Sequence, residues 1–134
     1  NPDAEDPVER LSSRPDAFIP CYAVVSFAAF RHQGSLVNLL GDKAEDWKMI
    51  RKFSAELQVT EDTPEAFIWH TAADQGVPVE NSLRLASALA IRGVPFELHI
   101  FPNGRHGLGL AKEMPDVAQW AGLLQNWLKM RNYN

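Results

Sequence analysis

The chain has 134 residues, of which 46% are hydrophobic and 22% are charged, a balance typical of one globular domain rather than of a disordered chain. Its formal net charge is -4 at pH 7 and it has no basic run, so neither nucleic acid nor an anionic membrane is an expected partner. The single cysteine, Cys21, excludes an intrachain disulfide and a zinc site built from several cysteines. The apolar runs are far too short to span a bilayer.

The start of the chain is polar and contains Pro2 and Pro7. We therefore expect a polar connector over residues 1–14 and a single domain of strand–helix units over residues 15–134. The chain begins at Asn1 and has no basic start followed by an apolar run, so no signal peptide is visible in it. A cytoplasmic protein and an exported protein whose signal has been removed both fit this sequence.

Three short segments have the composition of strands. Residues 17–27 and 66–71 are almost wholly apolar, as in strands that are covered on both faces. Pro20 interrupts the first of them and cannot donate to a ladder, so the strand either begins after Pro20 or places it at an unpaired position. Residues 96–101 alternate apolar and polar side chains, which predicts a third strand with one less buried face.

Three further segments repeat apolar side chains at helical spacing and are predicted to be helices: residues 44–55, 81–92 and 115–130. Gly93 and Pro95 follow the second of these segments and are typical of a helix end. Residues 31–41 have no clear periodicity, and we expect a loop or an irregular helix there. Strands and helices thus alternate along the chain.

This alternation predicts an α/β fold, with a parallel sheet flanked by helices. Three parallel strands would leave two open edges, whereas parallel sheets normally have both faces covered and their strands paired. The predicted sheet therefore looks like part of a larger doubly wound sheet.

Two polar residues follow strand ends in this arrangement. Asp74 lies three residues after Thr71, and His106 lies five residues after Phe101. Because neighbouring parallel strands open on one edge of the sheet, the two side chains are expected to meet there. An aspartate that binds one ring nitrogen of a histidine stabilises the charged ring and leaves the other nitrogen available as a general base. A flexible loop with a surface histidine explains the same spacing about equally well.

The residues around these two positions resemble the α/β-hydrolase superfamily, most closely its acetyl-esterase and acetylxylan-esterase-like branch, near the dienelactone-hydrolase-like proteins. The resemblance rests on residues 67–82, 95–101 and 104–107, and it extends from about Arg14 to the last helix. It implies that Asp74, in Asp-x-x-Val-Pro, and His106, in Gly-x-His-Gly, are the acid and the base of a catalytic triad. It also predicts that the chain is the C-terminal part of an α/β-hydrolase fold.

The third member of that triad, a serine in Gly-x-Ser-x-Gly, does not occur in these 134 residues. The resemblance places that element before the first predicted strand, upstream of Asn1, together with the oxyanion-hole donors. Ser26, Ser35 and Ser82 are better explained as turn or helix-cap residues, and Cys21 as an inert thiol in an apolar run. No residue of this chain is therefore assigned as the nucleophile.

By resemblance, the expected activity is that of a serine esterase on small-molecule or carbohydrate esters, with no cofactor and no metal. The chain alone is expected to be inactive. It is expected to pair with the missing N-terminal half, or with a copy of itself, through an open sheet edge.

Other readings use the same residues. A non-catalytic α/β remnant, or a flavodoxin-like module that binds a small molecule at the same rim, would not need a nucleophile. A metal site would draw on His70, Asp74, His99 and His106. It is less expected, because the first and third of these fall in different strands and the loops offer no second carboxylate at ligand spacing.

Overall fold

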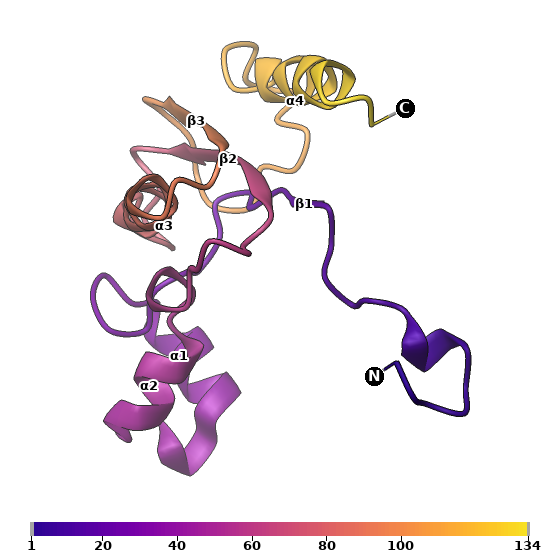
Figure 1. Cartoon of the computed structure of the whole chain (residues 1–134). Helices are drawn as coiled ribbons and strands as arrows, with labels where there is room; N and C mark the ends of the chain where they lie inside the picture. Colours follow the sequence, from indigo (N-terminus) through magenta and orange to yellow (C-terminus); the bar gives the residue numbers. More distant parts are fainter. Residues whose placement is uncertain (1, 134) are drawn as a thin grey trace.

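The computed structural model describes residues 2–133, and within them three parallel strands lie between helices (Figure 1). The strands, in sheet order, are β1 (Ala17–Phe18), β2 (Glu65–Thr71) and β3 (Phe96–Phe101). The α-helices are α1 (Gln33–Leu40), α2 (Trp47–Phe53), α3 (Glu80–Ile91) and α4 (Gln119–Met130). Short 3-10 turns are η1 (Val8–Arg10), η2 (Gly41–Lys43) and η3 (Ala55–Leu57). The predicted α/β class with a parallel sheet is confirmed.

The central strand, β2, is buried on both faces. It pairs with β3 from Ala66 to Thr71, so the two strands end at the same level. Ile68 packs into a cluster with α3, whereas Phe67 and Trp69 pack into a second cluster with α4. Figure 1 shows these two helices on opposite sides of the sheet. The almost wholly apolar sequence of β2 follows from this double cover.

The first strand is much shorter than the prediction over residues 17–27. Its ladder continues only as far as a bridge at Cys21, and the carbonyl of Pro20 accepts from the Trp69 N–H at 3.2 Å. Pro20 therefore lies where no backbone donor is needed. Tyr22 donates its N–H to the Trp69 carbonyl at 2.8 Å, and its φ of 39° then turns the chain out of the extended region.

Asn81, on α3, holds the apolar segment that follows this turn. Its Oδ1 accepts from the N–H groups of Val25 and Ser26, both at 2.9 Å. Its Nδ2 donates to the carbonyls of Phe30 and Pro78 at 2.9 and 3.0 Å. Because a fully buried side chain satisfies these backbone groups, the segment is buried without pairing as a strand.

The helices predicted from periodicity are present with shifted ends. α3 is followed by Gly93 at a φ of 68°, as its sequence predicts. α2 is shorter than residues 44–55, because the Asp46 side chain caps it by accepting from the Lys48 N–H at 2.9 Å. α4 begins at Gln119, since the residues before it form turns.

Residues 31–41 require a correction, since they contain a regular helix, α1. The ring of His32 caps it, with Nδ1 accepting from the Ser35 N–H at 3.1 Å. An imidazole is not one of the usual N-cap groups, so the start of this helix has no recognisable sequence signal. Leu36 and Leu40 are buried together with Ile50 of α2 in a third apolar cluster.

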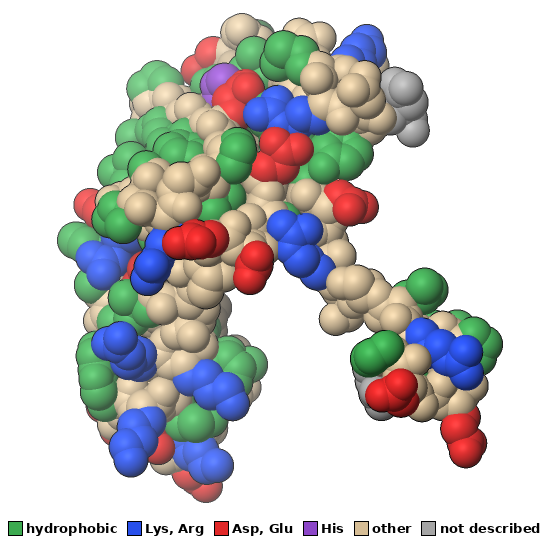
Figure 2. Space-filling model, viewed as in Figure 1, with side chains coloured by type: hydrophobic (Ala, Val, Ile, Leu, Met, Phe, Trp, Pro, Cys, Tyr) green, Lys and Arg blue, Asp and Glu red, His purple; other side chains and the backbone are tan. Residues whose placement is uncertain are grey.

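The segment before β1 forms an arm, and residue 1 lies outside the described residues. The arm leaves the body of the molecule, with open space between them in Figure 2, and several lysines and arginines gather on the lobe that α1 and α2 form. Arg10 closes a local turn by donating to the Ala4 carbonyl at 2.6 Å, and Arg14 donates to the Asp62 carbonyl at 2.7 Å. Connector and domain boundaries at residues 14 and 15 stay a prediction.

Within residues 2–133, none of the helices combines the length and the apolar character that crossing a membrane requires.

Candidate catalytic site

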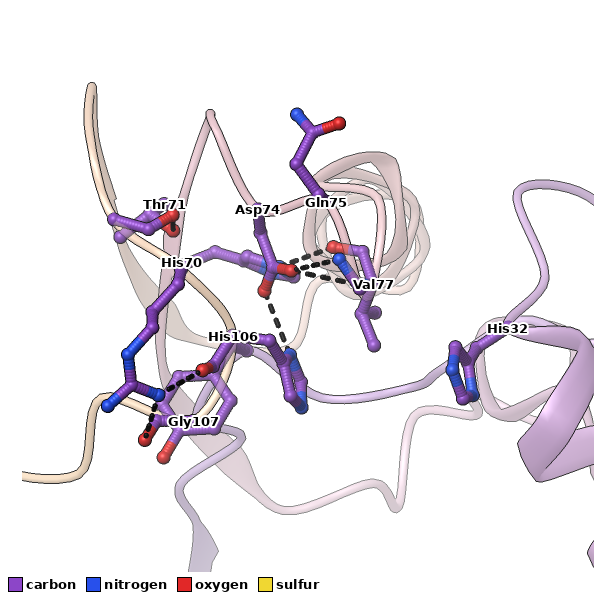
Figure 3. Close-up of polar contacts among 12 residues, drawn as sticks. His32, His70, Thr71, Asp74, Gln75, Val77, His106 and Gly107 are labelled. Carbon is purple, nitrogen blue, oxygen red and sulfur yellow. Dashed lines mark hydrogen bonds and ion pairs between the residues drawn. The ribbon is translucent and has the colours of Figure 1, made fainter.

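The loops after β2 and β3 bring Asp74 and His106 together. Their strands are parallel, adjacent and in register up to Thr71 and Phe101, so both loops leave the sheet at one rim. Asp74 Oδ2 lies 2.9 Å from Nδ1 of His106 (Figure 3). The meeting that the sequence predicts is thus a feature of the structure, and the role of the pair in catalysis stays a prediction.

Asp74 is fixed by its own loop. The residue is 6% exposed, and its Oδ1 accepts from the backbone N–H groups of Gly76 and Val77 at 2.8 and 2.9 Å. An aspartate that binds amides two and three residues ahead closes a tight turn without help from the rest of the fold. The second oxygen therefore points away from the loop, toward His106.

The same contacts keep the carboxyl ionised. Burial raises the pKa of Asp74, but hydrogen bonds from Val77, His106 and Gly76 together outweigh it and hold the pKa below its ordinary value. Hydrogen bonds to the charged form act in this direction because protonation would break them. A negative charge therefore faces Nδ1 of His106 at neutral pH.

The loop that carries His106 depends on glycine. Gly104 has a φ of 145°, and a Cβ there would lie 2.7 Å from Cγ2 of Thr71. The carbonyl of the same glycine accepts from Oγ1 of Thr71 at 3.0 Å, which ties the loop to the end of β2. On the facing loop, a Cβ on Gly76 would lie 3.1 Å from Cβ of His106. Both glycines thus permit the close approach of the two loops.

The ring of His106 is partly exposed, and its second nitrogen is not engaged by the described residues. Its side chain is 43% exposed, and among residues 2–133 no hydrogen bond reaches Nε2. Arg105 stiffens the turn by donating to the carbonyl of His106 at 2.9 Å. An open hollow beside the ring is lined in part by Gln75, Arg105 and Met114. The ring is thus held at Nδ1 and accessible at Nε2.

Tyr22 packs against this histidine, a contact that the sequence analysis misses. Its ring meets the rings of His106 and Trp69 edge-on, each at a centroid distance of 4.9 Å. Its hydroxyl accepts from the Gly109 N–H at 3.2 Å. The contact arises from the positive φ at Tyr22, which no local sequence pattern announces.

The other three histidines of the chain have separate structural contacts. His32 caps α1, away from the pair in Figure 3, and His99 contacts Glu97 at 2.7 Å on the α4 side of the sheet. His70 lies behind Asp74, with Nε2 3.3 Å from Oδ2. In the described part of the chain, no three His, Cys, Asp or Glu side chains are grouped so as to hold a metal ion.

The hydroxyl groups considered as nucleophiles have structural partners. Ser26 is fully buried and accepts from the N–H groups of Ala28 and Ala29 at 3.3 and 3.1 Å. Ser35 lies in the first turn of α1, 2.9 Å from the ring of His32. Ser82 is fully buried, with Oγ 2.8 Å from Nδ1 of His70.

The thiol of Cys21 is also poorly suited to attack a substrate. Burial raises the pKa of Cys21 and outweighs the opposing effect of the nearby Trp69 side chain, so the sulfur remains protonated at neutral pH. Its Sγ lies 3.6 Å from the carbonyl of Ile19, to which a protonated sulfur donates. None of the four residues that the sequence analysis considers therefore sits as an activated nucleophile.

Comparison with known proteins places the chain in a family. The model of the prolyl oligopeptidase family matches residues 19–131. The chain belongs to the prolyl oligopeptidase family. The predicted resemblance to α/β-hydrolases is confirmed by this match and by the solved structures that share its fold.

Known relatives of this member of the prolyl oligopeptidase family are hydrolases. An acetyl ester-xyloside bifunctional hydrolase from Caldicellulosiruptor lactoaceticus is 47% identical, with a TM-score of 0.95 over 99% of this chain and 48% of that one. A sugar hydrolase from Lactococcus lactis is 33% identical, with a TM-score of 0.71 over 88% of this chain and 49% of that one.

Among curated proteins, endo-1,4-beta-xylanase B of Butyrivibrio fibrisolvens is 41% identical over 122 residues, which make up 91% of this chain and 18% of that protein. The chain thus spans about half the length of the solved relatives and a much smaller share of the curated one.

Proposed function

We propose that this chain supplies the acid–base half of a carboxylic ester hydrolase. The observation that carries the proposal is the 2.9 Å contact between Asp74 Oδ2 and Nδ1 of His106, a histidine whose side chain is 43% exposed. That arrangement suits a general base oriented by a buried carboxylate. Membership of a family of hydrolases and esterases supports it.

In the proposed reaction a serine attacks the ester carbonyl, and Nε2 of His106 takes the proton of its hydroxyl. The ring is then positively charged, and the ionised Asp74 stabilises it through Nδ1. His106 gives the proton to the leaving alcohol, and an acyl group stays on the serine. Water, activated by the same ring, releases the acid. None of these steps calls for a metal or another cofactor.

The serine would come from a segment outside these 134 residues. No Gly-x-Ser-x-Gly occurs in the sequence, and the serines considered above are engaged in caps, turns or the core. We therefore propose that the chain alone does not hydrolyse esters. The donors that stabilise the tetrahedral intermediate would arrive with the same segment.

We propose that this segment docks beside β1. The outer edge of β1 has no strand partner among the described residues, and Phe18, Phe53 and Leu85 help to line an apolar groove there. A parallel strand with an unpaired edge favours addition of another strand. The missing half of the relatives' fold is the proposed occupant, and a second copy of this chain would compete for the same edge.

The proposed substrate is a small acyl ester, such as an acetyl group on a carbohydrate. The support comes from the solved relatives, one described as an acetyl ester-xyloside hydrolase and the other as a sugar hydrolase. Cleavage of xylan itself is not proposed, because the chain covers only 18% of the xylanase that it matches.

The test compares the 134-residue chain with the complete polypeptide that carries the serine element. We expect hydrolysis of p-nitrophenyl acetate and acetylated xylose by the complete protein only, and loss of both activities in its His106→Ala variant. Sedimentation of the chain alone is expected to show association.

Three results would overturn parts of this proposal. Hydrolysis by the chain alone that His106→Ala abolishes would reject an external serine. A complete protein that cleaves a chromogenic prolyl peptide far faster than acetate esters would reject the substrate class. A stable monomer at high concentration, with no binding to the remaining segment, would reject docking at β1.

A further inference from the structure

A buried histidine stands behind the Asp74–His106 pair and has no part in the proton transfer described above. His70 lies on the α3 side of β2 and is 0% exposed. Its Nδ1 lies 2.8 Å from Oγ of Ser82, a residue of α3. Its Nε2 lies 3.0 Å from the carbonyl oxygen of Val77 and 3.3 Å from Oδ2 of Asp74. Figure 3 shows Val77, His70 and His106 gathered around Asp74.

The partners of this ring decide which of its nitrogens carries the proton. The carbonyl of Val77 can only accept, so Nε2 of His70 must be the protonated nitrogen. In a neutral ring Nδ1 is then an acceptor, and the hydroxyl of Ser82 donates to it. Burial lowers the pKa of His70 and outweighs the opposing effects of Val77 and Asp74, which keeps the ring neutral. The Nε2–H thus meets the carbonyl of Val77 at 3.0 Å, with Oδ2 of Asp74 as a second acceptor atom 3.3 Å from the same nitrogen.

The position of His70 matters because the two oxygens of the Asp74 carboxylate have different partners. Oδ1 of Asp74 is bound by two backbone amides of its own loop. Oδ2 lies 2.9 Å from Nδ1 of His106, whose side chain is 43% exposed, and 3.3 Å from Nε2 of the fully buried His70. The terminal torsion of an aspartate is soft, so its oxygens stay in place only where donors hold them. His70 is the one of these two donors that does not change its charge when a proton is transferred at the rim.

We propose that His70 is a positioning residue, which donates Nε2–H to Oδ2 of Asp74 and keeps that oxygen directed at Nδ1 of His106. The Val77 carbonyl sets the tautomer that makes this donation possible, and the Ser82 hydroxyl donates to the other nitrogen. The kinetic consequence rests on the proposed function, whereas the hydrogen-bond arrangement does not.

Two amide variants, His70→Gln and His70→Asn, distinguish a positioning role of His70 from a packing role. In His70→Gln the amide nitrogen is as many bonds from the backbone as Nε2, so it can still donate to Asp74. In His70→Asn the amide nitrogen reaches only as far as Nδ1, so contact with Ser82 is possible but the donor to Asp74 is lost. Thermal unfolding of each variant gives the control for stability.

The first readout is the tautomer of neutral His106, measured by NMR of the imidazole nitrogens in the 134-residue chain. We expect the Nδ1–H form in the parent and in His70→Gln, and a mixture of both tautomers in His70→Asn. The second readout is kinetics of the complete protein on p-nitrophenyl acetate. We expect kcat to fall on the order of 10- to 100-fold in His70→Asn with KM unchanged, and to recover in His70→Gln.

Equal results for the two variants, in tautomer and in kcat, would overturn the proposal, since a packing role does not distinguish them. If neither variant folds, the parent chain still decides: a His70 that is charged, or protonated on Nδ1, at neutral pH also overturns it. A complete protein without esterase activity whose His106 nevertheless shows the tautomer change would reject the proposed function and support the positioning role.

Discussion

The two loops that meet at the rim are built in opposite ways. The Asp74 loop is short, buries its carboxylate and satisfies Oδ1 with its own amides. The His106 loop is longer, contains three glycines with positive φ and exposes 43% of the histidine side chain. A fixed carboxylate beside an accessible ring suits proton transfer, because the negative charge is already in place when the ring becomes positive. The loop after β2 thus holds the carboxylate rigidly, and the loop after β3 leaves the histidine ring accessible.

Removing the exposed partner is expected to have the largest effect. His106→Ala in the complete protein should lower kcat/KM for p-nitrophenyl acetate about 10⁴-fold, since the variant lacks the ring nitrogen proposed to accept the serine proton. His99→Gln is the matched control, because its ring contacts Glu97 on β3 and not the pair. The pair is not the acid–base machinery if His106→Ala retains more than a tenth of the parent activity.

Changing the fixed partner should have a somewhat smaller effect. In Asp74→Asn the two loop amides hold the amide oxygen in place of Oδ1, so the amide nitrogen faces Nδ1 of His106. Two donors then oppose each other, and His106 adopts the wrong tautomer. We expect kcat/KM to fall about 10³-fold. An undiminished rate in a variant that folds would show that the carboxylate does not orient the ring.

The flexible loop can also be tested through its glycines. Gly104→Ala combines a φ of 145° with contacts of 2.7 and 2.8 Å to Thr71 and Leu108, so unfolding in urea should show a loss of about 2 kcal/mol. Gly122→Ala, in α4, meets nothing within 4 Å and should stabilise the protein by about 0.5 kcal/mol. Equal effects of the two substitutions would mean that the loop adjusts freely.

The smallest expected effect is on the stability of the folded chain at acidic pH. The native pKa of Asp74 lies below its unfolded value, which is about 3.9, so the unfolded chain binds more protons between the two values. The stabilisation from this group is therefore complete above the unfolded value and disappears as the pH falls through the native one. Urea unfolding at several pH values should show a steeper acid loss in the parent than in Asp74→Asn. Parallel curves would contradict the lowered pKa.

The parts of the fold that sequence reasoning recovers are those with strong local signals. β2 is a continuous apolar run, β3 alternates, and Gly93 with Pro95 ends α3. The start of α1 is missed because a histidine ring replaces a usual cap. The segment after β1 is predicted as strand because it is apolar, but Asn81, far along the chain, supplies the hydrogen bonds that let it be buried without pairing as a strand.

The site divides in the same way. That Asp74 and His106 approach each other follows from two neighbouring strands and the spacing after each. The contacts of Tyr22 and His70 do not follow, because they depend on a positive φ and on which residue of α3 lies under the sheet. Neither of these is encoded in a short stretch of sequence. Topology therefore predicts the pair, and tertiary packing decides what supports it.

The position of the pair within the sheet has a consequence for assembly. Asp74 and His106 follow β2 and β3, which share a continuous ladder, whereas β1 pairs with β2 at Ala17 and Phe18 and then only at the bridge of Cys21. Loosening of β1 would leave that ladder intact, so the contact between Asp74 and His106 could form before another strand pairs with the free edge of β1. Tyr22 follows β1 and contacts the ring of His106, so a change in the pairing of β1 would reach the histidine through this residue.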